Sequence, residues 1–104
     1  MLIPEHSPIH PGVVLLEEFV KPLGITQTKL AEDIGVPIQR VNLLIKGKRN
    51  MTPDTALRLS RYLGTTPDVW LNLQQVWDVW HELHGARARE IKAVRPLRRL
   101  ARTG

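Results

Sequence analysis

Polar side chains that can read DNA bases stand close together in the middle of this 104-residue chain. Arginine pairs with guanine in the major groove, and glutamine or asparagine pairs with adenine. All three residue types occur within a short stretch, at Gln39, Arg40 and Asn42. We expect these three side chains to contact base edges, provided that one helix carries them on its outer face.

The segment from Thr26 to Lys46 predicts two short helices that would hold these side chains in place. Thr26 is a good N-cap for a helix over residues 27–34, and Gly35 can end that helix in a left-handed conformation. Pro37, whose fixed φ suits a first turn, then starts a second helix that runs to about Lys46. Apolar residues mark the inner faces of both helices: Leu30, Ala31, Ile34, Ile38, Val41 and Ile45.

The spacing of the two helices is that of the DNA-binding helix-turn-helix. The alternative is a generic helical hairpin, because most pairs of amphipathic helices joined by a glycine bind no DNA. We favour the DNA reader, since small and apolar residues fall where the motif requires them and hydrogen-bond donors lie on the outer face.

A second set of residues is expected to hold the DNA backbone. Phosphate contacts position a protein without reading sequence, and the free amide groups at a helix start attract anions. For Lys48 and Arg49 a solvated loop is the alternative. The expected phosphate contacts are Thr26, Gln27, Thr28, Lys46, Lys48 and Arg49.

Three further helices complete the predicted all-α domain of five helices. The first runs from Pro11 to the stop signals Pro22 and Gly24, and its expected apolar face is Leu16, Phe19, Val20 and Leu23. The other two run over residues 53–63 and 67–84, and each starts with Thr-Pro-Asp, which suits a helix N-terminus. We therefore divide the chain into a lead-in (1–10), a helix-turn-helix domain (11–84) and a basic C-terminal tail with some helical character (85–104).

The helix over residues 67–84 is apolar on more than one face, so it must be buried on more than one face. We expect the stripe of Trp70, Leu73, Trp77 and Trp80 to form a homodimer interface. Helix-turn-helix readers usually bind two half-sites as dimers, which favours this interpretation. The alternative is that the three tryptophans fill one intramolecular core.

Residues 85–104 carry seven of the 15 basic side chains and one of the ten acidic ones, so the net charge of +5 describes the tail rather than the body. Apolar residues recur there at intervals of three (Ile91, Val94, Leu97 and Leu100), and Pro96 interrupts any continuous helix. Three interpretations of the tail are open. It docks on a partner, it adds non-specific attraction to nucleic acid, or it is solvated and partly disordered.

Several classes of protein are disfavoured. The chain has no cysteine, no apolar run near the roughly 18 residues of a membrane span, and no signal-peptide pattern, so we expect a soluble cytoplasmic protein. Glu5, His6 and His10 are better read as part of a loose segment than as metal ligands, and His81 and His84 are one residue too close for the zinc-protease motif. We expect no metal, no cofactor and no enzymatic activity, because no nucleophile–base pair or phosphate loop is present.

An ordered set of short matches extends from His10 to about Leu73. It consists of His10-Pro11-Gly12, residues 15–19, 21–24, 35–37, 39–42, 47–49 and 52–59, and Trp70-Leu71-Asn72-Leu73-Gln74. In these residues the chain resembles the HigA/VapI type of toxin–antitoxin antidote, within the lambda-repressor-like helix-turn-helix class. Leu43 departs from the pattern, because similar proteins often have a polar or acidic residue there. It either contacts a thymine methyl group or packs against neighbouring helices.

The resemblance implies a small dimeric antitoxin. Such a protein neutralises a RelE-like messenger-RNA-cleaving toxin and represses its own operon through palindromic double-stranded operator DNA. A stand-alone helix-turn-helix repressor without a toxin partner is the main alternative, and a protein-interaction module that has lost DNA binding is another.

Overall fold

The first helical stretch, from Pro11 to Leu23, changes its hydrogen-bonding pattern along its length. In the computed structural model, which describes residues 2–97, α1 (Pro11–Val14) continues into a π-helix, η1 (Leu15–Val20), and ends as α2 (Lys21–Leu23). Hydrogen bonds in a π-helix run between residues five apart. Leu15 and Val20 therefore lie on the same side, and both are buried.

This π turn changes which apolar residues face the core. Leu16 and Phe19 of the expected face are half-buried and Val20 is buried, but Leu23 is 58% exposed. Leu15, which the sequence interpretation left out, is fully buried instead. The prediction for Leu23 is wrong because it assumed regular α-helical spacing, whereas the wider π turn shifts the register of the residues that follow it.

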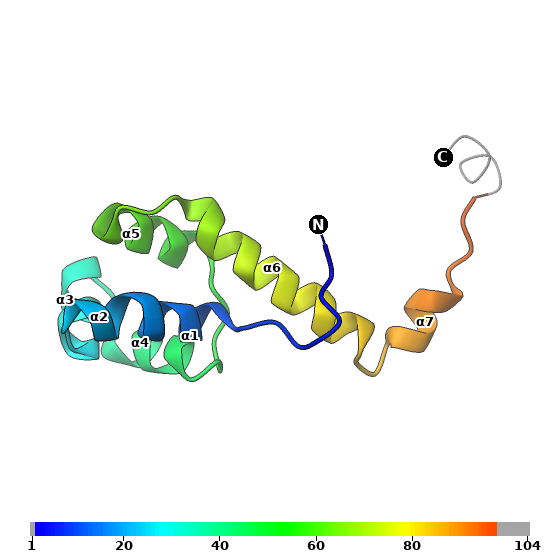
Figure 1. Cartoon of the computed structure of the whole chain (residues 1–104), viewed down its shortest axis with the longest axis horizontal. Coiled ribbons are helices and arrows are strands. Elements are labelled where there is room, and N and C mark those ends of the chain that lie inside the picture. The colour runs from blue at the N-terminus through cyan, green and yellow to red at the C-terminus, as the bar shows by residue number, and fades with distance from the viewer. Residues whose placement is uncertain (1, 98–104) are drawn as a thin grey trace.

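The remaining helices are α3 (Gln27–Ile34), α4 (Ile38–Ile45), α5 (Pro53–Leu63), α6 (Pro67–Leu83) and α7 (Ala88–Ala93). The continuous stretch over residues 11–23 and the helices α3 to α6 correspond to the five expected helices, and α7 lies in the expected C-terminal extension (Figure 1). The expected all-α class is confirmed, since residues 2–97 contain helices and no strand.

One core joins the five helices of the body, and each contributes a side chain with almost no exposed surface: Leu15, Leu30, Leu44, Leu59 and Trp70. Gly12 lets α1 come close to α4, because a Cβ atom at this position would lie 1.8 Å from the backbone oxygen of Leu44. The same packing places α3 and α4 side by side, with α5 against α3 and α6.

The molecule is elongated, with principal extents of 54 × 26 × 22 Å. The buried residues of α6, Trp70 and Gln74, lie in its first half, and its second half runs out of the helical body toward α7 (Figure 1). Between residues 2 and 97, no helix combines the length and the apolar character that crossing a membrane requires. The tail residues Arg98, Arg99, Leu100 and Arg102 lie outside the described residues.

Candidate nucleic-acid interface

The helix pair α3–α4 is built by the local signals that the sequence predicts. The Oγ1 atom of Thr26 accepts a hydrogen bond from the backbone N–H of Lys29 at 3.0 Å, which caps the start of α3. Gly35 ends α3 in a left-handed conformation with φ of 73°. Pro37 is the N-cap of α4 rather than its first helical residue, so α4 begins at Ile38. Thr26 and Thr28 are exposed and Gln27 is half-buried at the start of α3.

The buried side of α4 fixes which of its side chains face outward. Val41, Leu44 and Ile45 are 9% exposed or less, and Ile38 is half-buried. Because an α-helix turns by about 100° per residue, the opposite strip carries Gln39, Leu43 and Lys46, and all three are exposed. Asn42 and Arg40 are half-buried on the two flanks of this strip. Gln39 therefore lies on the outward strip, while Arg40 and Asn42 lie beside it.

Arg40 is engaged by a neighbouring helix. Its Nη1 atom donates to Oδ2 of Asp54, in the first turn of α5, at 2.9 Å. The Nε atom of Arg58 donates to both oxygens of the same carboxylate at 3.1 Å, and its Nη1 atom donates to the backbone oxygen of Ile34 at 2.8 Å. The carboxylate of Asp54 thus connects the end of α3, α4 and α5.

The charges around Asp54 also favour its ionised form. Hydrogen bonds from Arg58, followed by the charges of Arg58 and Arg40, hold the pKa of the Asp54 carboxyl below its ordinary value. This group was not predicted, because Asp54 was interpreted only as part of the Thr-Pro-Asp start of its helix. The spacing of Asp54 and Arg58, four residues apart on one helix, is the signal that could have found it.

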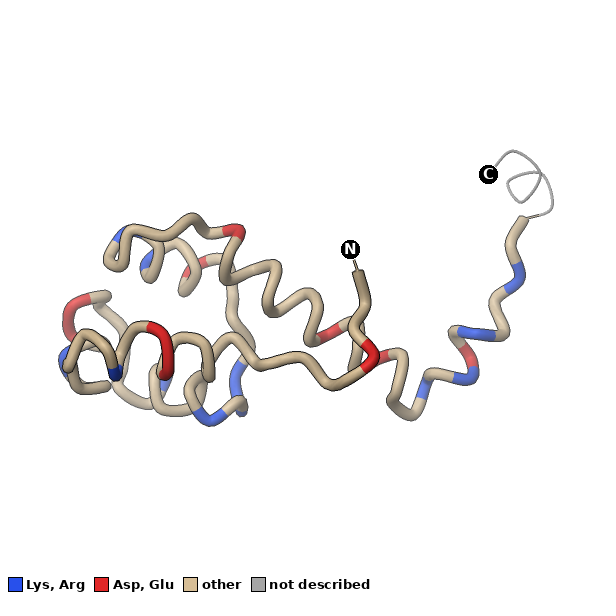
Figure 2. Tube along the Cα trace, in the orientation of Figure 1, with Lys and Arg blue, Asp and Glu red and all other residues tan. Residues whose placement is uncertain are grey.

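The expected phosphate-contacting residues after α4 form no ion pair with any residue that the structure describes. Lys46, Lys48 and Arg49 are exposed, and none of the ion pairs within residues 2–97 involves them. Figure 2 shows the basic residues of this turn gathered at the end of α4, on one edge of the helical body. The positive charge of the turn therefore faces solvent directly beside the outward strip of α4.

A buried glutamine attaches this basic turn to α6. Gln74 is 5% exposed, and its Oε1 atom accepts a hydrogen bond from the backbone N–H of Met51 at 2.7 Å. Its Nε2 atom donates to Asp78 at 2.9 Å and to Asn50 at 3.3 Å. Gln74 is among the residues that carry the family resemblance, but no structural role was predicted for it, because its helix was interpreted from its apolar residues. The segment that follows Lys48 and Arg49 is held in place by these bonds.

The expected dimer stripe does not form one continuous surface. Trp70 is fully buried, packs against Phe19 with ring centroids 5.4 Å apart, and donates from Nε1 to Oγ1 of Thr65 at 2.9 Å. Trp70 is therefore a core residue and cannot line an interface, because α6 crosses the core at this point. Leu73, Trp77 and Trp80 are half-buried. Leu73 packs against the core, whereas Trp77 and Trp80 lie in the part of α6 that leaves the body.

Histidines cover part of the other two tryptophans. The ring centroid of Trp77 lies 5.0 Å from that of His10, in an edge-to-face arrangement, and 4.0 Å from that of His81. Trp80 stacks on His84 with ring centroids 3.9 Å apart. The Nδ1 atoms of His81 and His84 each lie 2.8 Å from the backbone oxygen of the tryptophan four residues earlier. His81 and His84 therefore pack against the tryptophan rings and cover part of their surface.

His10 is buried, whereas Glu5 and His6 of the same segment are exposed. The Nδ1 atom of His10 accepts a hydrogen bond from the backbone N–H of Gly12 at 2.9 Å, so the ring caps the start of α1. The Nε2 atom has no hydrogen-bond partner among the described residues. Burial lowers the pKa of His10; Asp78 opposes this effect and His81 adds to it.

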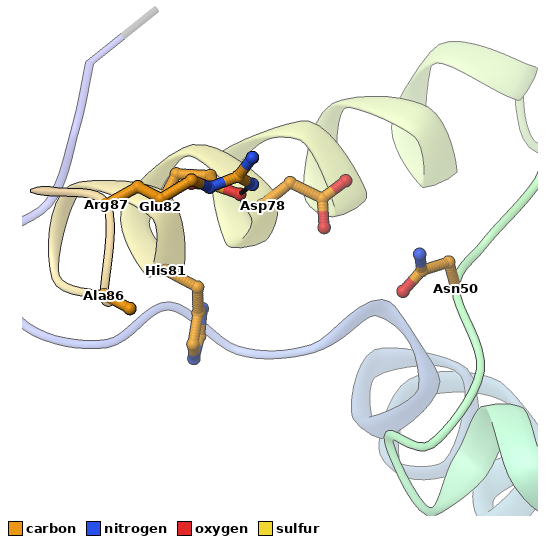
Figure 3. A pocket seen from close by; sticks show the side chains of 7 residues that line it. Asn50, Asp78, His81, Glu82, Ala86 and Arg87 are labelled. Carbon is orange, nitrogen blue, oxygen red and sulfur yellow. Dashed lines mark hydrogen bonds and ion pairs between the residues drawn. The ribbon is translucent and has the colours of Figure 1, made fainter. Parts of the chain in front are cut away.

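An open cavity of about 450 Å³ lies where α6 meets the turn toward α7. Its lining includes Asn50, Asp78, His81, Glu82 and Arg87, and Glu82 forms an ion pair with Arg87. In Figure 3, His81 points away from Asp78 and from the Glu82–Arg87 pair. Residues 2–97 contain no group of three or more histidine, aspartate or glutamate side chains placed to hold a metal ion.

Known proteins resemble the chain over most of its length. A helix-turn-helix family model matches residues 16–70. Virulence-associated protein I of Dichelobacter nodosus is 43% identical, over 72% of this chain and 69% of that protein. Antitoxin HigA-1 of Vibrio cholerae is 40% identical, over 89% and 87%. A solved structure of the antitoxin GraA in complex with its operator superposes with a TM-score of 0.82 at 38% identity, covering 93% of this chain and 98% of that one.

Proposed function

The chain belongs to the helix-turn-helix family, within its HigA/VapI group, and we propose that it is an antitoxin that binds operator DNA and represses its own operon. The observation that carries this proposal is the outward strip of α4. Gln39 and Lys46 are exposed on it, directly beside a basic turn whose charges have no internal ion pair among the described residues. Such a strip can enter the major groove while the turn lies against the phosphates.

In this proposal Gln39, Arg40 and Asn42 contact bases. Gln39 approaches the groove directly, and Arg40 and Asn42 reach it from the flanks of the strip. One N–H of the Arg40 guanidinium is used by Asp54, which leaves its remaining donors for DNA. The pairing with Asp54 fixes the direction in which the guanidinium points.

Phosphates are held by two groups of residues. Thr26, Gln27 and Thr28 present the free amides at the start of α3. Lys46, Lys48 and Arg49 present charges at the end of α4. The relative that is named an antitoxin and the structure of GraA with its operator support DNA binding as the function of this fold.

We also propose that the chain binds palindromic DNA as a homodimer and neutralises a RelE-like mRNA-cleaving toxin. In this proposal the protein acts in the cytoplasm and has no enzymatic activity of its own. Leu73, Trp77 and Trp80 remain the proposed dimer surface, and Trp70 is withdrawn from it because it is buried. Sedimentation of the purified chain is expected to give twice the monomer mass, and a monomer at micromolar concentration would contradict this part of the proposal.

Fluorescence anisotropy on two labelled duplexes across a salt series tests the DNA-binding function. One duplex is the DNA just upstream of the chain's own gene, and the other is a scrambled sequence of the same composition. We expect a preference for the upstream DNA of roughly a thousandfold or more. Equal and steeply salt-dependent binding to both duplexes would mean that non-specific charge dominates, and it would overturn the proposal of operator recognition.

Co-expression with the reading frame beside the gene tests the toxin-neutralising function. We expect the neighbouring product to stop growth when expressed alone, and this chain to restore growth and to co-purify with it. A chain that binds its upstream DNA specifically but neither restores growth nor co-purifies with the neighbouring product would instead be a stand-alone repressor.

A further inference from the structure

Leu43 is the one exposed large apolar side chain of α4, all of which lies within the described residues. Its surface is 39% exposed, whereas that of Leu44, the next residue, is 2% exposed. Packing against neighbouring helices therefore accounts for Leu44 but leaves much of Leu43 open to solvent. Burial of apolar surface is favourable, and the exposed part of Leu43 can be buried only by contact with something other than residues 2–97.

The position of Leu43 points to the surface that it serves. It follows Gln39 by four residues and precedes Lys46 by three, and residues at these spacings lie on one face of a helix. Gln39 and Lys46 are both exposed. Leu43 thus stands at the centre of the outward strip, with polar side chains before and after it.

The charges around Leu43 favour one class of partner. Lys46, Lys48 and Arg49 are exposed at the end of the same helix, and none of the ion pairs between described residues involves them. An apolar side chain beside three unneutralised cations suits a polyanion that also presents an apolar group. Double-stranded DNA has both properties, since each thymine places a C5-methyl group in the major groove.

We propose that Leu43 is a specificity-determining residue that contacts the C5-methyl group of a thymine in each half-site of the operator. This inference rests on the proposed function and adds to it a base that the polar side chains do not read. Glutamine and arginine select bases through hydrogen bonds to polar edges, whereas a leucine selects the methyl group that distinguishes thymine from cytosine at the same edge. We therefore expect each half-site to contain a thymine whose methyl group strengthens binding only when Leu43 is present.

Deoxyuridine provides a direct test, because it pairs as thymidine does and lacks only the methyl group. The upstream duplex is first narrowed to its operator by footprinting. Each thymidine is then replaced by deoxyuridine, in symmetric pairs, and affinities are measured by anisotropy. We expect one pair of positions to weaken binding by about fourfold for each half-site, or about 15-fold for both, the effect of losing one buried methyl group per half-site.

Two matched variants show whether Leu43 is the residue responsible. Leu43→Ala removes the proposed contact, and we expect it to bind the thymidine and deoxyuridine operators equally. Leu57→Ala removes an exposed leucine of α5 (58% exposed) that lies outside the proposed interface, and we expect it to keep the difference between the two operators. Circular dichroism of both variants checks that the helices are intact.

The outcomes separate this inference from the function on which it rests. A chain that shows no preference for the upstream DNA loses the proposed function and this inference together. Specific binding that is insensitive to every deoxyuridine substitution overturns only the inference. A sensitivity that persists in Leu43→Ala overturns it too, because another residue then reads the methyl group. Unchanged operator affinity of Leu43→Ala would equally overturn the thymine contact.

Discussion

Arg40 of α4 and Asp54 of α5 are joined by an ion pair, with 2.9 Å between Nη1 and Oδ2. The same carboxylate receives the Nε atom of Arg58, which also holds the last carbonyl groups of α3. The outward helix of the motif is therefore connected to its two neighbours through one carboxylate. The side chains of Arg40 and Asp54 are 28% and 55% exposed, so solvent screens the pair and its main effect is on orientation rather than on stability.

Replacing Arg40 with alanine is expected to weaken binding to the operator by about 1–3 kcal/mol and to relax the preference at one base pair. Asp54→Asn keeps Arg40 but removes the charge that orients it, so we expect a smaller loss at the same base pair. Anisotropy on operators mutated one base pair at a time measures both effects. An Asp54→Asn protein with unchanged base preference would show that the ion pair does not position Arg40 on DNA.

Lys48→Ala tests the phosphate role of the turn after α4. A lysine that neutralises one phosphate releases about one counterion, so its loss is expected to lower the salt slope of binding by about one. All duplexes are expected to weaken alike, because phosphates carry no sequence information. Lys21→Ala is a suitable control, since Lys21 is paired with Glu17 at 2.8 Å. A loss confined to one sequence would assign Lys48 to base contact instead.

Gln74→Ala is expected to destabilise the fold by about 1–3 kcal/mol, because it leaves the buried N–H of Met51 without its acceptor. Loosening of this segment is also expected to weaken the contribution of Lys48 and Arg49 to DNA binding. Gln75→Ala is the matched control, since Gln75 is exposed on the same helix. Urea unfolding of both variants measures the difference, and equal midpoints would contradict the structural role of Gln74.

The sequence predicts the helices well where their signals are local. Thr26 and Gly35 mark both ends of α3 through capping and a left-handed turn, and the structure shows both features. The π-helix was not predictable from apolar spacing, because the pattern of Leu16, Phe19, Val20 and Leu23 fits an ordinary α-helix equally well. Its consequence, the exposure of Leu23 and the burial of Leu15, depends on packing against the rest of the domain.

The sequence predicts which face of α4 points outward, but it does not predict the contacts that its side chains make with other helices. Helical periodicity places Gln39 and Lys46 outward, since it depends only on the residues of α4 itself. The pairing of Arg40 with Asp54 joins residues 14 apart in the sequence, and that of Gln74 with Met51 joins residues 23 apart. Such contacts follow from the way the helices cross. For the same reason a spacing argument put Trp70 on the surface, although the crossing of α6 over the core buries it.

Acidification is expected to destabilise the chain through His10. Burial places its folded-state pKa below the ordinary value of 6.5, so the unfolded chain binds the proton more readily than the folded one. The contribution of His10 is therefore complete above about pH 6.5 and is lost as the pH falls toward the folded-state pKa. Protonation of Nδ1 would also remove the acceptor of the Gly12 N–H, which caps α1.

Urea unfolding of His10→Asn at pH 8 and pH 5.5 checks this prediction. Asparagine is a good N-cap and does not titrate, so the variant is expected to lose less stability on acidification than the original chain. His6→Asn, at an exposed position of the same segment, is expected to behave as the original chain does. An equal pH response of His10→Asn and the original chain would mean that groups other than His10 cause the loss.

Gly12→Ala tests the close approach of α1 to α4 that supports the interface from behind. The added Cβ atom would meet the backbone oxygen of Leu44 at 1.8 Å, and a backbone atom cannot move aside as the end of a side chain can. We expect a loss of stability of about 1–3 kcal/mol or more, with weaker operator binding because α4 must shift. Val13→Ala, next in the chain and exposed, is expected to change neither quantity by much. A Gly12→Ala protein with the original melting temperature would contradict the role of this close contact between α1 and α4.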